Sequence, residues 1–163
     1  MSSLGERLDN ITLRVHVPGT EIRAELRDRK NIGISFGPDV YQWLSERHLE
    51  HYLATLARLL YVGWNREYHA ALSDSFVGAD APQNPRDREF LDARDELESQ
   101  GASGDGRITV SAVGMQNVEV RIATGTLRAL SEQDFVARVK EAVNAFLEDY
   151  LTKIRGLKVR FFA

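Results

Sequence analysis

The chain has 163 residues, of which 43% are hydrophobic and 28% charged, and this balance excludes wholesale disorder and indicates a globular protein. The absence of cysteine excludes disulfides, thiolate nucleophiles and cysteine-based metal sites. A net charge of -3 means that a nucleic-acid-binding role would need a local basic face, since phosphate contacts dominate such binding. The first ten residues lack a signal-peptide pattern, and no apolar stretch reaches the roughly 20 residues of a membrane span, so we expect a cytoplasmic protein with no membrane partner.

Three antiparallel strands are predicted in the first part of the chain. Apolar and polar residues alternate in residues 11–17, 21–27 and 32–36, which is typical of strands with one buried and one wet face. Turn residues separate these runs at Pro18–Thr20 and Asp28–Asn31.

A long helix follows the third strand. Ser45 is the predicted N-cap, because its hydroxyl can accept a bond from an otherwise unpaired backbone N–H group. The helix is predicted to run to about Leu72, with a leucine every third or fourth residue. This apolar stripe consists of Leu49, Leu53, Leu56 and Leu60.

Residues 73–83 are predicted to be a linker, because small, polar and proline residues dominate them. Asn84 and Pro85 then predict the start of a helix that ends near Gln100. The glycine-rich run at Gly101–Gly106 is expected to terminate it.

A hairpin and a second long helix are predicted next. Residues 107–122 alternate on both sides of a turn at Gly114–Asn117. Ser131 is the predicted cap of the last helix, and Gly156 its predicted end. Alternation in Leu157–Phe162 predicts a terminal strand.

The two predicted serine caps suggest that the chain contains an internal repeat, with two copies of one unit. They lie 131 - 45 = 86 residues apart, and the same offset brings Ile22 onto Ile108 and Leu49 onto Phe135. The inward positions match without a gap from Ile22 to Leu60. The alternative is coincidence, since any two hairpin-plus-helix units share such a pattern. The ungapped register favours a repeat, and one such unit alone buries too little apolar surface to be stable.

We therefore predict an α+β fold of two tandem β-hairpin/helix units that form an intramolecular pseudo-dimer, with antiparallel sheets packed on helices. The predicted boundaries are residues 1–72 for the first unit, 73–83 for the linker and 84–163 for the second unit with its terminal strand.

Residues 84–155 carry a family resemblance. They contain "SGDGRITVSAVG", "VEVRI" and the capped helix "LSEQDFVARVKEAVNAFLEDYL". This order resembles the YbaB/EbfC family of small nucleoid-associated proteins, especially its actinobacterial relatives. The resemblance implies a helix, strands, helix order, dimers that join their sheets, and DNA binding without strong sequence preference. Some relatives act beside secretion systems, which implies a second role as a protein-binding or chaperone-like adaptor. The helix from Pro85 to Gln100 departs from the basic helices of the family, since its acids outnumber its arginines.

Basic residues form two groups that could bind a phosphate backbone. If the two sheets join, these groups would form one positive strip; the alternative is an ordinary solvated face, partly neutralised by neighbouring acids. The first group is Arg14, Arg23, Arg27, Arg29 and Lys30. The second group is Lys153, Arg155, Lys158 and Arg160.

Large aromatic residues are concentrated in the first unit. They either anchor a protein partner or fill the core. The candidate partner-binding residues are Trp64, Tyr68 and Tyr61. They are chosen because Trp64 and Tyr68 lie on a predicted extension of the helix that has no counterpart in the second unit. His48 and His51, three residues apart, either lie on a surface helix or meet at a metal ion; no third ligand is evident, so no metal site is predicted.

Signatures of enzymes are missing from the sequence: it has no GxxxxGK[ST], GxGxxG or GxSxG motif. We expect a non-enzymatic binding protein without a cofactor, either a weak, non-specific DNA-binding module or a protein-interaction module, as a monomer or a homodimer.

Overall fold

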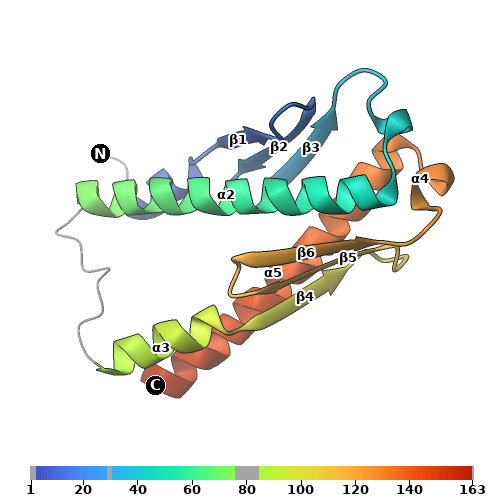
Figure 1. The fold of residues 1–163 in the computed structure, drawn as a ribbon. Coiled ribbons are helices and arrows are strands. Elements are labelled where there is room, and N and C mark those ends of the chain that lie inside the picture. Colours follow the sequence, from blue (N-terminus) through green and yellow to red (C-terminus); the bar gives the residue numbers. More distant parts are fainter. Residues whose placement is uncertain (1–2, 29–30, 76–84, 163) are drawn as a thin grey trace.

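The computed structural model describes residues 3–28, 31–75 and 85–162. It consists of two antiparallel three-stranded sheets, each followed along the chain by a long helix (Figure 1). The predicted α+β class, with antiparallel sheets packed on helices, is confirmed.

The first half forms sheet A, whose strand order is β1-β2-β3. Alternation of apolar and polar residues buries one face of the central strand, β2, and leaves most of the other exposed. The elements are α1 (Leu4–Asp9), β1 (Leu13–His16), β2 (Ile22–Arg27), β3 (Asn31–Phe36), the 3-10 helix η1 (Tyr41–Trp43) and α2 (Glu46–Ser75).

The second half forms sheet B in the order β4-β5-β6. Adding 86 to the bounds of β2 and β3 gives the bounds of β5 and β6, so the element order repeats at the offset that the sequence predicts. The elements are α3 (Pro85–Asp95), β4 (Glu98–Ala102), β5 (Ile108–Val113), β6 (Asn117–Ile122), α4 (Thr126–Ala129) and α5 (Glu132–Phe162).

Both predicted serine caps are present. The hydroxyl of Ser45 accepts a hydrogen bond from the backbone N–H of His48, and that of Ser131 accepts one from Asp134, each at 3.1 Å. Each cap satisfies one of the unpaired N–H groups at a helix start. The predicted cap Asn84 and nearly all of the predicted linker lie outside the described residues.

A strand that the sequence patterns do not predict precedes the hairpin of the second unit. The helix that begins at Pro85 ends at Asp95 instead of Gln100, and Glu98–Ala102 forms β4, paired with β5. The inward positions of β4 are Ser99 and Gly101, both buried. Because neither is a large apolar residue, the alternation of this strand is hidden in the sequence.

The predicted terminal strand is wrong. Leu157–Phe162 continues α5, and Gly156 lies within the helix. Leu157 and Phe161 are half-buried, four residues apart, while the positions between them are exposed. This spacing fits the helix face that packs against α3, where the ring of Phe90 lies 6.1 Å from that of Phe161. A glycine in a helix costs only about 1 kcal/mol, which such packing offsets.

The two halves share one hydrophobic core. Residues at matching positions are completely buried in both: Ile22 and Ile108 in the central strands, and Leu49 and Phe135 in the long helices. All four belong to the same buried cluster. The predicted inward residues of the central strands β2 and β5 are therefore buried in this core, and those of β1 and β3 are half-buried against it.

Each long helix packs against strands of both sheets. α2 contacts β1 of sheet A and β6 of sheet B, and α5 contacts β4 of sheet B and β3 of sheet A. Figure 1 shows α2 crossing between the two sheets. The helix of each half thus covers an edge strand of the other half.

Tyr41 connects the two halves at the start of the long helices. Its hydroxyl donates a hydrogen bond to the backbone carbonyl of Leu130 at 3.0 Å, and its ring lies 5.6 Å from the rings of both Phe36 and Phe135. Burial, together with the nearby carboxylates of Glu46 and two residues of α5, raises the pKa of Tyr41 to about 12. The phenol therefore remains a hydrogen-bond donor at neutral pH.

Carboxylates of α2 bind the backbone at the end of β6. Glu50 accepts a hydrogen bond from the N–H of Ile122 at 2.8 Å, and Glu46 accepts one from Gly125 at 3.1 Å. In the same manner Asp149 of α5 accepts one from Gln100 of β4 at 2.8 Å. Helix side chains thus satisfy N–H groups on both edge strands of sheet B.

Gly101 allows β4 to lie directly on α5. A Cβ atom at this position would lie 2.1 Å from the backbone nitrogen of Phe146. Gly33, on β3, has no atom within 4 Å of the corresponding Cβ position. The two glycines therefore provide a matched comparison, because both lie in strands but only Gly101 is in close contact with a helix.

We expect Gly101→Ala to lower the free energy of unfolding by about 1–3 kcal/mol, because backbone atoms must move apart. Gly33→Ala should leave the stability unchanged or raise it by up to about 1 kcal/mol, because the strand loses a flexible glycine. Chemical denaturation of both variants measures the difference. Equal stability of the two variants would contradict the close contact of β4 with α5.

Candidate nucleic-acid interface

The outward face of sheet A carries three of the predicted basic residues. Arg14 of β1 and Arg23 and Arg27 of β2 are exposed, at positions that alternate with the buried row. Arg14 lies opposite Glu25 in the strand register, and Arg23 lies opposite His16. The alternation of the strands therefore gathers these side chains on one surface, which we call the arginine face.

Glu25 lies among these arginines and pairs with two of them. Its carboxylate accepts a hydrogen bond from Nε of Arg27 and another from Nε of Arg14, the latter at 3.3 Å. The hydrogen bond from Arg27, and the positive charges of Arg27 and Arg14, lower the pKa of Glu25. The strands of this face carry three positive charges and one negative charge, while Glu21 and Asp28 lie just beyond the ends of β2.

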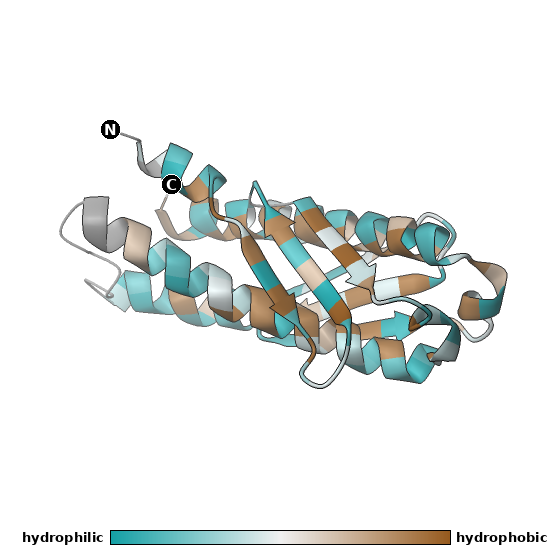
Figure 2. Cartoon of the chain, turned by 90° about the horizontal axis from the view of Figure 1, so that it is seen from above, coloured by the Kyte–Doolittle hydropathy of each residue, from teal (hydrophilic) through white to brown (hydrophobic). Residues whose placement is uncertain are grey.

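Helices cover only the inner side of sheet A. Seen from above, the sheet lies over the helices with no element in front of it (Figure 2). A shallow hollow opens at its edge, lined by the polar side chains of Asn10, Thr12, Arg14, Arg27 and Asp28. An extended charged ligand could therefore reach the arginine face without a conformational change.

The corresponding face of sheet B lacks this charge. At the offset of 86, Arg14 corresponds to Gln100, Arg23 to Thr109 and Arg27 to Val113. Glu25 corresponds to Ser111. The two halves thus match at the inward positions and differ at the outward positions, where the strands of sheet A carry three arginines and those of sheet B carry Arg121, which pairs with Glu119.

The second predicted basic group does not join the first. Sheets A and B are separate within the described residues, and the single positive strip expected from joined sheets is not formed. Figure 1 shows sheet A and the end of α5 on opposite sides of the molecule. Arg29 and Lys30 lie outside the described residues, and the second group lies on α5: Lys153, Arg155, Lys158 and Arg160.

Two residues of the α5 group make contacts within the protein. Nζ of Lys153 donates to the carboxylate of Asp149 at 2.9 Å and to the carbonyl of Glu98 at 2.8 Å. The guanidinium of Arg160 lies 5.3 Å from the centre of the Phe161 ring. The acidic helix α3 packs beside them, so this end of α5 is less suited to a phosphate backbone than the arginine face.

The candidate partner-binding aromatics are half-buried. Trp64 packs against the core and stacks on Tyr68, with ring centres 6.3 Å apart, and Tyr61 is also half-buried. The prediction that α2 extends beyond the matching helix of the second unit is wrong, because α5 continues to Phe162 and matches α2 in length. By contrast Trp43 of η1 is 80% exposed.

His48 and His51 are both exposed on α2 and contact Tyr52, with ring centres 6.2 and 5.9 Å apart. Within residues 3–28, 31–75 and 85–162, no group of three or more histidine or carboxylate side chains is arranged to hold a metal ion. No helix in the described part of the chain is long and apolar enough to cross a membrane.

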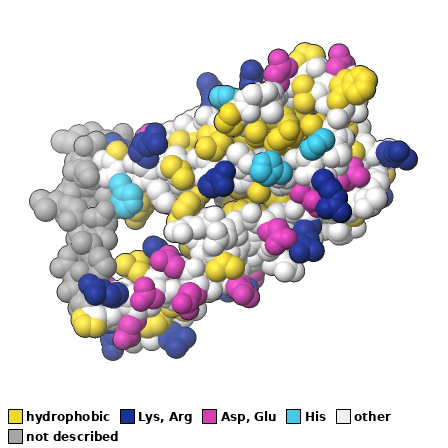
Figure 3. All heavy atoms as spheres, viewed as in Figure 1, with side chains coloured by type: hydrophobic (Ala, Val, Ile, Leu, Met, Phe, Trp, Pro, Cys, Tyr) yellow, Lys and Arg dark blue, Asp and Glu magenta, His cyan; other side chains and the backbone are white. Residues whose placement is uncertain are grey.

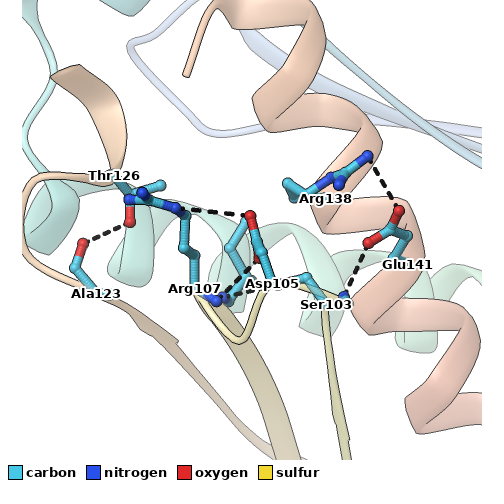
Figure 4. Close-up of polar contacts among 9 residues, drawn as sticks. Ser103, Asp105, Arg107, Ala123, Thr126, Arg138 and Glu141 are labelled. Atoms are coloured by element: carbon cyan, nitrogen blue, oxygen red, sulfur yellow. Dashed lines mark hydrogen bonds and ion pairs between the residues drawn. The ribbon is translucent and has the colours of Figure 1, made fainter. Parts of the chain in front are cut away.

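The "SGDGR" segment, which contributes to the family resemblance, forms the turn between β4 and β5 (Figure 4). Asp105 accepts hydrogen bonds from the hydroxyl of Ser103 at 2.7 Å and from the N–H of Arg107 at 3.0 Å, and both lower its pKa. Glu141 of α5 accepts one from the N–H of Gly104 at 2.9 Å. These bonds fix the turn on α5, so the segment has a structural role.

Comparison of this chain with protein-family models, with curated proteins and with solved structures finds no match. The assignment of a function therefore depends on the geometry of the chain itself.

Proposed function

We propose that this protein is a non-enzymatic DNA-binding module of the YbaB-like kind, which contacts the phosphate backbone through the arginine face of sheet A. The observation that supports this proposal is the cluster of Arg14, Arg23 and Arg27 on an uncovered sheet, absent from the equivalent face of sheet B. Guanidinium groups suit this role because they bind phosphate oxygens through paired N–H donors.

The properties of the face favour weak and non-specific binding. Three arginines allow only a few phosphate contacts, and Glu25 neutralises part of their charge. The third strand offers small outward residues, namely Asn31, Gly33 and Ser35, which leave the surface flat. A flat face that contacts only phosphates carries no direct information about the base sequence.

The matching element order favours the further proposal that the two halves are copies of one unit, arranged as an intramolecular pseudo-dimer. Each half has the helix, strands, helix order that the YbaB resemblance implies, and each long helix covers the other half's sheet edge. In this proposal the inward positions were retained for folding, and the outward positions diverged so that one copy binds DNA.

A protein-interaction or adaptor role is the second candidate, and exposed Trp43 favours it. Tryptophan is enriched among residues that anchor protein interfaces. Its counterpart at the offset of 86 is Ala129, so this feature also belongs to one half only.

Removal of two arginines from the arginine face is the direct test of DNA binding. The variant Arg23→Gln/Arg27→Gln should lower the affinity for labelled duplex DNA about tenfold or more at low salt. It should also reduce the slope of log affinity against log salt by about 2, because two phosphate contacts are lost. Fluorescence anisotropy at several salt concentrations measures both quantities.

The matched control is Thr109→Glu/Val113→Glu, which changes the net charge by the same amount at the corresponding positions of sheet B. Its affinity should stay within about twofold of the wild type, apart from long-range charge effects. Equal losses in the two variants would show a dependence on net charge alone. No binding by the wild type at low salt would reject the DNA-binding role and leave the adaptor role.

Removal of the acid from the arginine face should have the opposite effect. We expect Glu25→Gln to strengthen DNA binding about three- to fivefold at low salt, because Arg14 and Arg27 lose their competing carboxylate. Glu119→Gln removes an acid from the outward face of sheet B, where it pairs with Arg121, and should have little effect. The same anisotropy titration compares the variants, and weaker binding by Glu25→Gln would contradict the proposed contact surface.

A further inference from the structure

The end of α5 exposes large apolar side chains. Leu151, Val159 and Phe162 are 48%, 65% and 50% exposed. They make up half of the six large hydrophobic side chains that are exposed in the described part of the chain. A concentration of exposed apolar side chains is typical of interaction sites.

Cationic residues share this surface. Leu151, Arg155, Lys158 and Phe162 follow the spacing i, i+4, i+7, i+11 and therefore lie along one side of α5. Arg155 and Lys158 are exposed and make no ion pair within the described residues. We call this side of α5 the cationic stripe.

The neighbouring helix α3 has a small excess of acidic residues, four against three arginines. Its exposed Glu89 and Asp92, and Glu96 just beyond it, make no ion pair within residues 3–28, 31–75 and 85–162. Figure 3 shows acidic side chains gathered over this arm of the molecule. α3 is fastened to α5 by Phe90, whose ring centre lies 5.2 Å from that of Phe162. The apolar pair Phe90 and Phe162 thus lies where the acidic helix meets the cationic stripe.

We propose that this arm, α3 with the end of α5, is the interface through which a second copy of the chain binds. In a twofold dimer the cationic stripe of each copy lies on the acidic α3 of the other, and the exposed apolar side chains meet near the axis. Both contacts form at once, because a twofold interface is made of the same surface on each copy.

A second copy fits this surface in charge and in length. α3 has 11 residues, or about 16 Å, and residues 151–162 of α5 span about the same length. In such a dimer, the acids and bases that have no ion pair among the described residues of one copy become partners between two copies. The surface is small, so we infer a weak, reversible dimer that dissociates as salt rises.

Such a dimer goes beyond the proposed DNA-binding role and does not depend on it. It would present two arginine faces, so that a duplex able to reach both would be bound more tightly. Dimerisation can be measured without DNA, so failure of one proposal leaves the other untouched.

Sedimentation velocity over a range of protein concentrations and two salt concentrations tests the dimer. The wild type should shift from monomer toward dimer as its concentration rises. The variants Arg155→Glu/Lys158→Glu and Glu89→Lys/Asp92→Lys should each weaken the association at least about tenfold, because each places like charges in both contacts. Circular dichroism of each variant checks that the fold is retained.

An equimolar mixture of the two variants provides the decisive experiment. It should restore the dimer, because each contact then pairs opposite charges again. Arg23→Glu/Arg27→Glu carries the same charge reversal on sheet A and should dimerise like the wild type. A wild type that is monomeric at every concentration, a dimer that neither variant weakens, or a mixture that stays monomeric would overturn the proposal.

Discussion

The structure depends on the exchange of long helices between the two sheets. α2 lies against β1 of its own sheet and β6 of the other, and α5 lies against β4 and β3. A unit of the size of one half buries a smaller fraction of its surface on folding than a larger domain does, and its stability is correspondingly marginal. Exchange allows both inward rows to enter one core, so neither half is expected to be stable without the other.

The core tolerates differences between the halves because their volumes compensate. Leu56 of the first half corresponds to Ala142, while Leu49 corresponds to the larger Phe135. In each half a glycine allows a strand to lie close to a long helix, but the two halves place that glycine on different elements. Gly101 lies on the strand in sheet B. In the first half Gly63 lies on the helix, where a Cβ would be 3.4 Å from Leu13. Shape is conserved by total packing rather than by identical residues.

Sequence patterns predicted the elements whose inward residues are large and apolar. Both serine caps and five of the six strands follow from alternation and helical spacing. β4 was missed because Ser99 and Gly101 form its inward row. The alternation in Leu157–Phe162 predicts a strand, but the same residues can also fill one face of a helix. Packing against α3 decides in favour of the helix, and this contact cannot be read from the local sequence. The arginines of sheet A were predicted, but their separation from the α5 group depends on tertiary arrangement.

The most direct test of the shared core is native-state hydrogen exchange, residue by residue. If the two halves unfold as one unit, the slowest amides of β2 and β5 should open with the same free energy, within about 0.5 kcal/mol, and this value should equal the global stability from denaturant unfolding. A clearly lower opening free energy for either central strand, or two separate denaturant transitions, would show that the halves fold independently and would contradict the account.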